Sequence, residues 1–174
     1  MNDFWPAAWE LTTLENIAQI STGCPYRTFE YPEDSLNEVR LINQIGEDTI
    51  ELSEPKFMKI SEREIVKYKL KDNDLIFAHR TSPRQLGKIV RFDLTGTVIH
   101  TANFLRIRPF EAVNSRLIEE AMKIYKLQGL FARLGSVHPN LQSLSVEQLK
   151  RVKIPMIDAD ALHNSQEFFA LCKV

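Results

Sequence analysis

The chain has 174 residues and a mass of 20.1 kDa, which suits a single domain. Hydrophobic residues make up 44% and charged residues 26%, an ordinary globular composition that excludes a disordered chain. No apolar run approaches the ~20 residues of a bilayer span, and the first residues lack a secretory signal, so we expect no membrane association. Two cysteines exclude a disulfide scaffold and favour a reducing, cytoplasmic compartment.

The formal net charge of -1 conceals a segregation of charge along the chain. Residues 1–66 are rich in Asp and Glu, whereas residues 67–153 carry an excess of Lys and Arg. That asymmetry permits an anionic partner at one face, and nucleic acid is the obvious candidate. The alternative is that the two surfaces neutralise each other or face different partners.

The N-terminal part is predicted to contain one short helix. Thr12 and Glu15 fit a capping box, so the helix should begin after Thr12 and end near Gly23. The other expected elements are an extended segment, a loop with two prolines, a strand and a turn of helix, at residues 7–11, 24–36, 39–45 and 61–66.

The middle of the chain is predicted to form four strands, at residues 75–78, 87–92, 97–102 and 103–109. The first is uniformly apolar, as in a buried strand. The last alternates, with Leu105 and Ile107 on one face and Arg106 and Arg108 on the other.

The period then changes from that of strands to that of helices. Apolar residues at helical spacing predict a helix over 116–128, interrupted by Gly129. A capping box from Ser145 to Gln148 predicts a second, short helix. Residues 152–155 are strand-like and residues 161–171 a weak helix. Strands followed by helices favour an α+β fold over alternating βαβ units.

Catalytic and cofactor motifs are absent from the sequence. There is no phosphate-binding glycine loop, no zinc-protease motif, no nucleophile elbow and no Cys/His cluster. We therefore expect no cofactor and no bound metal, and favour a binding module. A metal-dependent nuclease using Asp34, Glu54 and Lys56 is a weaker alternative, because Pro55 would remove a ladder amide between the acid and the base.

The remaining polar residues are of the types that read nucleic acid. Residues 79–85 place two arginines, a histidine, two hydroxyls and a glutamine in one expected loop, and residues 136–142 form a second. The arginine guanidinium forms two parallel hydrogen bonds to a guanine edge or a phosphate, and side-chain amides pair in the same way with adenine. The candidate DNA-binding residues are Arg27, Arg80, Arg84, Gln85, Lys88, His138, Asn140 and Gln142.

Blocks along most of the chain resemble the target recognition domain of the specificity (S) subunit of type I restriction–modification systems. The blocks are Leu14-Glu-Asn-Ile-Ala-Gln-Ile-Ser-Thr-Gly, Val39-Arg-Leu-Ile-Asn-Gln-Ile-Gly, Tyr68-Lys-Leu-Lys-Asp-Asn-Asp-Leu-Ile-Phe-Ala, Gly87-Lys-Ile-Val, Asn103-Phe-Leu-Arg-Ile-Arg and the closing run from Asn140 to Pro155. Their order and spacing, more than any single block, carry the resemblance.

The resemblance implies an α+β fold with a curved, partly closed antiparallel β-sheet and flanking helices. It implies a non-catalytic role, namely reading one half of a bipartite DNA target and positioning a methyltransferase (M) subunit and a restriction (R) subunit. We expect residues 1–157 to form one recognition domain and residues 158–174 a short tail, because the long spacer helix of the family is absent or truncated.

Two further expectations concern partners. Paired C-terminal tails could make a homodimer that reads two half-sites. The alternative function is a protein-interaction module of the same fold that has lost DNA reading, with Glu33, Asp34 and Glu38 on its interaction face.

Overall fold

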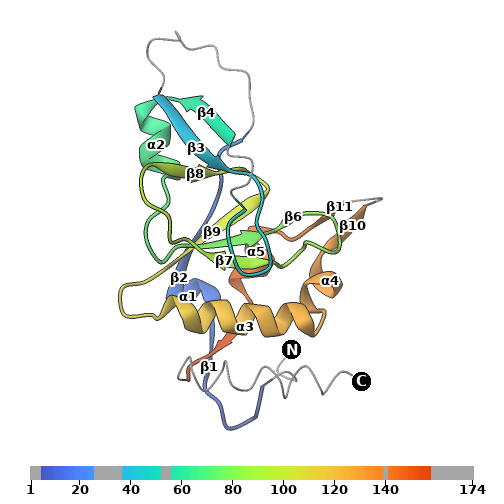
Figure 1. Ribbon diagram of the computed structural model, residues 1–174. Coiled ribbons are helices and arrows are strands. Elements are labelled where there is room, and N and C mark those ends of the chain that lie inside the picture. Colours follow the sequence, from blue (N-terminus) through green and yellow to red (C-terminus); the bar gives the residue numbers. More distant parts are fainter. Residues whose placement is uncertain (1–4, 26–36, 52–55, 139–140, 158–174) are drawn as a thin grey trace.

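The computed structural model describes residues 5–25, 37–51, 56–138 and 141–157 (Figure 1). The helices are α1 (Leu14–Ile17), α2 (Glu62–Tyr68), α3 (Ser115–Leu127), α4 (Leu130–Leu134) and α5 (Val146–Lys150). The strands are β1 (Leu11–Thr13), β2 (Ala18–Thr22), β3 (Asn37–Ile42), β4 (Lys56–Ile60), β5 (Leu75–Ala78), β6 (Arg80–Thr81), β7 (Ile89–Arg91), β8 (Val98–His100), β9 (Phe104–Pro109), β10 (Ser136–His138), β11 (Leu141–Ser143) and β12 (Lys153–Pro155).

A four-stranded antiparallel sheet in the order β2-β9-β5-β7 forms the centre of the molecule. Leu75 and Phe77 of β5 face the amphipathic helix α3 and belong to the largest apolar cluster, together with Leu105 and Ile107. Burial of these side chains is the main driving force that fixes α3 on this face, at roughly 25 cal/mol per Å² of apolar surface.

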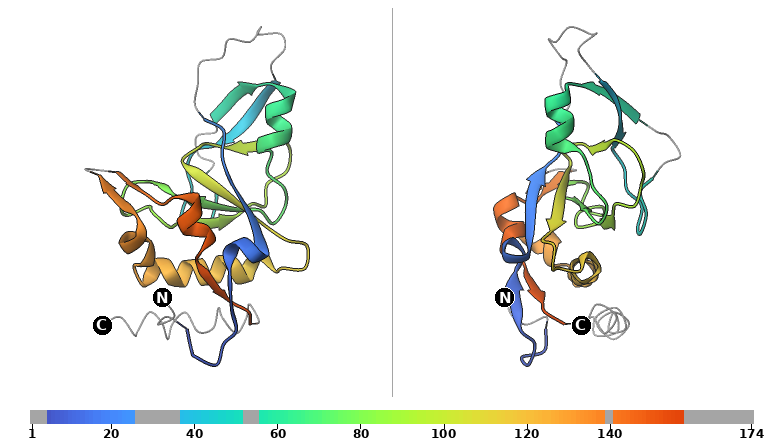
Figure 2. Two further views of the ribbon diagram at one scale, coloured as in Figure 1. Left: turned by 180° about the vertical axis from the view of Figure 1, so that it is seen from behind. Right: turned by 90° about the vertical axis from the view of Figure 1, so that its left-hand side faces the viewer.

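The opposite face of the central sheet is covered as well. Ile76 and Ala78 of β5 pack there in a second apolar cluster. Beyond it lies a three-stranded sheet, β4-β3-β8, whose inner face packs against α2. Figure 2 shows from two further sides that α2 and α3 lie on opposite sides of the central sheet.

Two smaller sheets complete the fold. β1 pairs with β12, so segments near the two ends of the described chain lie side by side at the α3 end. β10, β11 and β6 form a three-stranded antiparallel sheet that projects to one side of the molecule (Figure 1). This sheet joins two segments that the sequence predicted as loops, so the loop prediction for both was wrong in part.

The predicted fold class is confirmed: helices flank mostly antiparallel sheets. Among the described residues none of the sheets closes into a barrel. One pairing differs from the expectation, because β3 and β8 are parallel, with Leu41 opposite Ile99. The buried strand β5, the alternating strand β9 and the long helix α3 lie where the patterns placed them.

Of the two predicted capping boxes, only one forms. The capping box at Ser145 is confirmed, since the Ser145 hydroxyl accepts a hydrogen bond from the Gln148 amide at 3.1 Å. The box at Thr12 is wrong: α1 begins after Thr13 and has only four residues. The helix cannot continue to Gly23 because Ala18–Thr22 pairs with β9, and the sheet's hydrogen bonds override the local preference.

The strand predicted over 39–45 is shifted, since β3 ends at Ile42. The helix predicted over 161–171 lies outside the described residues. Within the described ranges, no helix combines the length and apolarity that crossing a bilayer requires.

Candidate nucleic-acid interface

The first predicted loop forms a closed turn at the end of β5, residues 79–88, which we call the arginine turn. Its base is fixed by backbone hydrogen bonds from Ala78 to the Lys88 carbonyl (2.8 Å) and from Gly87 to the Ala78 carbonyl (2.9 Å). Gly87 has a φ of 83°, and a Cβ there would collide with the ring of Phe131. Glycine is therefore required where the turn rejoins the core.

His79 ties the arginine turn to two other segments. Its Nδ1 lies 2.9 Å from the Leu144 carbonyl oxygen and its Nε2 lies 2.9 Å from the Ala102 carbonyl oxygen. A carbonyl only accepts, so both hydrogen bonds form together when the ring carries two N–H groups. His79 thus has an anchoring role, and Arg80 follows it directly.

The second predicted loop lies beside the first. In the sheet β10-β11-β6, Gln142 is opposite Thr81 and Ser143 is opposite Arg80. Leu144 adds a backbone hydrogen bond to the His79 carbonyl at 2.8 Å. Two segments about sixty residues apart in the sequence therefore present one continuous surface.

The structure separates the predicted basic residues into two kinds. Arg80 and Arg84 are exposed, and within the described ranges neither has an ion-pair partner. Lys88, in contrast, is 8% exposed and lies 2.8 Å from the Glu47 carboxylate. Gln85 is half-buried, and Gln142 is buried with no hydrogen-bond partner for its Oε1 among the described residues.

A cavity of about 220 Å³ adjoins the arginine turn, and we call it the amide cleft. Asn43 and Gln44 line it together with Thr81 and Gln85, so three residues with side-chain amides and one with a hydroxyl adjoin the same cavity. Its lining residues are Asn43, Gln44, Ile45, Ala78, Thr81, Gln85 and Phe104. Sequence reasoning missed Asn43 and Gln44, because it assigned them to a strand. The signal that could have found them is two adjacent amides at the end of an apolar alternation.

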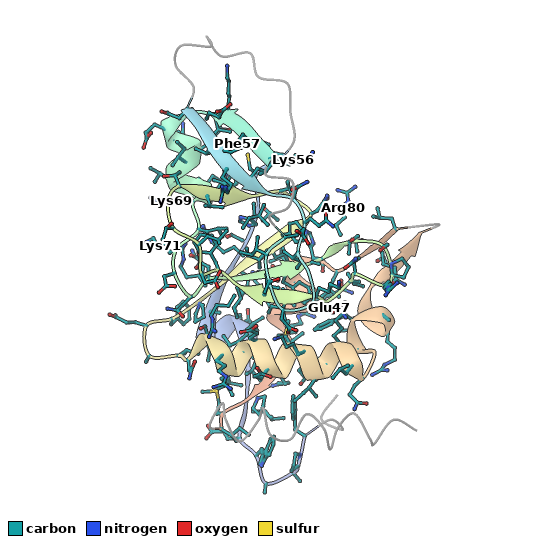
Figure 3. The ribbon with its side chains drawn as sticks, in the orientation of Figure 1. Glu47, Lys56, Phe57, Lys69, Lys71 and Arg80 are labelled. Carbon is teal, nitrogen blue, oxygen red and sulfur yellow. The ribbon has the colours of Figure 1, made fainter. Side chains whose placement is uncertain are left out.

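A second hollow, of about 170 Å³, lies next to the amide cleft and holds a cluster of lysines. We call it the lysine hollow; it is lined by Glu47, Asp48, Lys88, Ile89, Lys123, Lys126 and Leu127. Figure 3 shows Glu47 and Arg80 on the same flank of the molecule, away from Lys69 and Lys71.

The remaining predicted residues are not placed. Arg27 and Asn140 lie outside the described residues, and so do Glu33, Asp34 and Glu54 of the alternative functions. His138 ends β10, but its side chain is not described. Lys56 begins β4 and Glu38 is exposed on β3. Within the described ranges, no group of three His, Cys, Asp or Glu side chains is placed to hold a metal ion.

The described arrangement offers three chemistries on one flank. Exposed arginines fork onto phosphates or guanine edges, and amides pair with the N6 and N7 of adenine. Hydroxyl and backbone groups of the turn can hold a phosphate in register. This combination is typical of a surface that reads base edges.

Comparison with a curated protein gives a relative in sequence. The chain is 26% identical over 160 residues to the protein named as the MjaX type I restriction enzyme specificity subunit of Methanocaldococcus jannaschii. The match covers 87% of this chain and 36% of that protein. The chain therefore spans just over a third of the length of this relative. A scan of protein families found no match.

Solved structures give the same result for the fold. A type I restriction–modification S subunit from M. genitalium matches 95% of this chain and 40% of its own chain, with a TM-score of 0.52 and 10% identity. The HsdS subunit from Thermoanaerobacter tengcongensis matches 96% and 37%, with a TM-score of 0.54 and 12% identity.

A third structure, described as showing complex assembly and conformational transition of the type I R-M system, has a TM-score of 0.58 and 13% identity. It matches 96% of this chain and 38% of its own. The resemblance to type I specificity subunits that the sequence blocks indicated is thereby confirmed.

Proposed function

We propose that this chain, which has the fold of type I S subunits, reads a short sequence in duplex DNA and performs no chemistry itself. The observation that carries the proposal is the amide cleft, which three amide-bearing residues line next to two exposed arginines without ion-pair partners in the described ranges. The arginines supply affinity for phosphates or guanine, and the amides supply discrimination between bases.

The named relative supports the same role, because it is a specificity subunit. In this proposal residues 1–157 act as one recognition domain, with residues 158–174 as a tail. A methyltransferase subunit and a restriction subunit are the partners that such a domain would position over its target. A homodimer would place two domains on a palindromic site with a fixed spacing.

Selection from a random pool of duplex DNA tests the proposal directly. The purified chain is expected to enrich a short motif, and a spaced palindrome would add that it binds as a dimer. Failure to enrich any motif, at both low and moderate salt, contradicts autonomous DNA reading.

Substitutions at the site then test the roles of its two parts. Arg80→Ala with Arg84→Ala is expected to weaken binding to all sequences if the arginines bind phosphates. The salt slope should then fall by about one for each phosphate that is no longer neutralised. Arg63→Ala, an exposed arginine on α2, is the matched control and should leave binding unchanged.

The amides have a different expected signature. Asn43→Ala, Gln44→Ala or Gln85→Ala should cost about 1–3 kcal/mol on the selected motif and leave binding to random DNA and the salt slope unchanged. Equal losses on both DNAs would assign these amides to phosphate binding.

A further inference from the structure

The lysine hollow is closed by a short acidic hairpin, residues 45–50, which we call the acidic latch. Ile45 and Ile50 form an isolated bridge and are buried, and Gly46 donates a backbone hydrogen bond to the Thr49 carbonyl at 2.8 Å. The base of the latch is thus held in the core, whereas Glu47 and Asp48 at its tip are exposed.

The tip carboxylates contact three lysines from two other elements. Glu47 lies 2.8 Å from the Lys88 amine and 3.6 Å from the Lys126 amine, and Asp48 lies 2.9 Å from the Lys123 amine. Lys123 also contacts Glu119 on its own helix at 3.1 Å. The three lysines of the hollow are thereby paired with two carboxylates from the tip of the latch.

Electrostatics agree with that geometry. The hydrogen bond from Lys88 holds the pKa of Glu47 below its ordinary value. Burial acts to lower the pKa of Lys123, but its hydrogen bond to Asp48 and the nearby Glu119 raise that pKa above its ordinary value. The raised pKa keeps Lys123 charged at neutral pH, so its amine attracts anions.

The latch is weakly held at its tip. The side chains of Glu47 and Asp48 are 66% and 74% exposed, whereas that of Lys88 is 8% exposed. Exposed ion pairs contribute only about 0–1 kcal/mol each and weaken with salt, so a denser polyanion can displace the carboxylates.

The hollow and the amide cleft are lined by neighbouring parts of the same two segments. The segment 43–48 lines both, through Gln44 and Ile45 on one side and Glu47 and Asp48 on the other. The segment 78–89 does the same, through Gln85 and then Lys88. This closeness along both segments allows the backbone of DNA seated in the cleft to reach the hollow.

Building on the proposed function, we propose that the lysine hollow is a second, latched phosphate site for the DNA backbone. The acidic latch occupies it in the free protein and suppresses binding to DNA of arbitrary sequence. DNA phosphates replace Glu47 and Asp48 on Lys88, Lys123 and Lys126 when the backbone runs past the cleft.

The test opens the latch and measures binding to random-sequence duplex DNA at several salt concentrations. Glu47→Gln with Asp48→Asn should bind more tightly than the unmodified chain at low salt. Each additional phosphate that a lysine neutralises makes affinity fall roughly threefold more between 50 and 200 mM salt, and three such phosphates steepen the salt slope by about 2.7.

A matched control separates the local site from the general increase in positive charge. Asp93→Asn with Glu111→Gln removes the same charge at two exposed positions outside the hollow. Adding Lys123→Gln and Lys126→Gln to the opened latch should abolish its tighter binding. The proposal is overturned if the control binds as tightly as the opened latch, if the tighter binding survives the lysine substitutions, or if affinity falls.

This readout is independent of the proposed sequence reading. Random-sequence DNA requires no motif, so the latch can be measured even where the selection enriches nothing. Thermal unfolding of each variant confirms that the compared proteins are folded.

Discussion

The arginines near the start of strand β5 and those after its end are in opposite states. Before its start, Asp74 is 1% exposed and receives two hydrogen bonds from Arg108, at 2.7 and 2.6 Å. Beside them Arg106 is buried and donates to the carbonyls of Lys67 and Lys69 at 3.3 and 3.2 Å. After the end of β5, Arg80 is exposed and has no ion-pair partner in the described ranges.

The difference shows that a count of Lys and Arg residues overstates the number of positive charges that a ligand can contact. Part of the excess between residues 67 and 153 serves the interior, where burial lowers the pKa of Arg106, two carbonyls accept from its Nη1, and a carboxylate pairs with Arg108. Another part is neutralised by the acidic latch. The arginine turn keeps its charge for a partner.

The largest expected effect lies at the start of β5. Asp74→Ala should destabilise the protein by about 3 kcal/mol, because it leaves a partly buried guanidinium and the Lys71 amide without their acceptor. Chemical denaturation measures the loss. Asp74→Asn, which keeps the shape and one acceptor oxygen but removes the charge, is the matched control and should cost less; equal losses would show that the charge, not the acceptor or the packing, is responsible.

The next effect concerns His100, which is fully buried with no partner for either ring nitrogen among the described residues. Burial, with Arg106 and His79 adding to it, lowers the pKa of His100 from 6.5 to about 3. Below pH 6.5 the imidazole of His100 is therefore protonated in the unfolded chain but stays neutral in the folded chain. The free energy of unfolding then decreases as pH falls.

Between pH 7 and pH 5 this linkage amounts to about 2 kcal/mol. Denaturation of the unmodified chain and of His100→Leu at both values isolates the contribution, since Leu cannot titrate. An identical pH dependence of stability in the two proteins would show that His100 does not contribute to it.

An effect of similar size is expected where the arginine turn meets the core. Gly87→Ala should cost about 1–3 kcal/mol, because its φ of 83° disfavours a side chain and the added Cβ meets the Phe131 ring. Gly96→Ala, also at positive φ but with open space around its Cβ, measures the backbone part alone. Equal costs at the two positions would contradict a steric role for Phe131.

The smallest effect on stability is expected at the end of β5. Arg80→Ala and Arg84→Ala should change the free energy of unfolding by no more than about 0.5 kcal/mol, because their side chains are exposed. The same variants should lose DNA affinity. A large loss of stability would mean that Arg80 and Arg84 contribute to folding, as Arg108 does through Asp74.

Elements with a strong local pattern could be predicted from the sequence. In the uniformly apolar β5, the alternating β9 and the amphipathic α3, the pattern of apolar residues itself predicts which side chains are buried. The alternation in β9 gave the correct faces. It could not show that the Arg106 face is covered, because Arg106 donates to carbonyls of α2 and the residue after it, which are distant in sequence.

The candidate site was only half accessible to sequence reasoning. The arginine turn stood out because its polar residues are contiguous. The pairing of β6 with β11, the convergence of Asn43 with Gln85, and the ion pair that withdraws Lys88 all depend on contacts between remote segments. No local pattern encodes such contacts.

The amide cleft combines a fixed floor with changeable walls. Ile45, Ala78 and Phe104 beneath it are buried members of one apolar cluster, whereas Asn43 and Gln44 are exposed. Exchanging such exposed side chains usually shifts stability by less than about 0.5 kcal/mol. New target sequences could therefore evolve, or be engineered, at these positions while the scaffold stays the same.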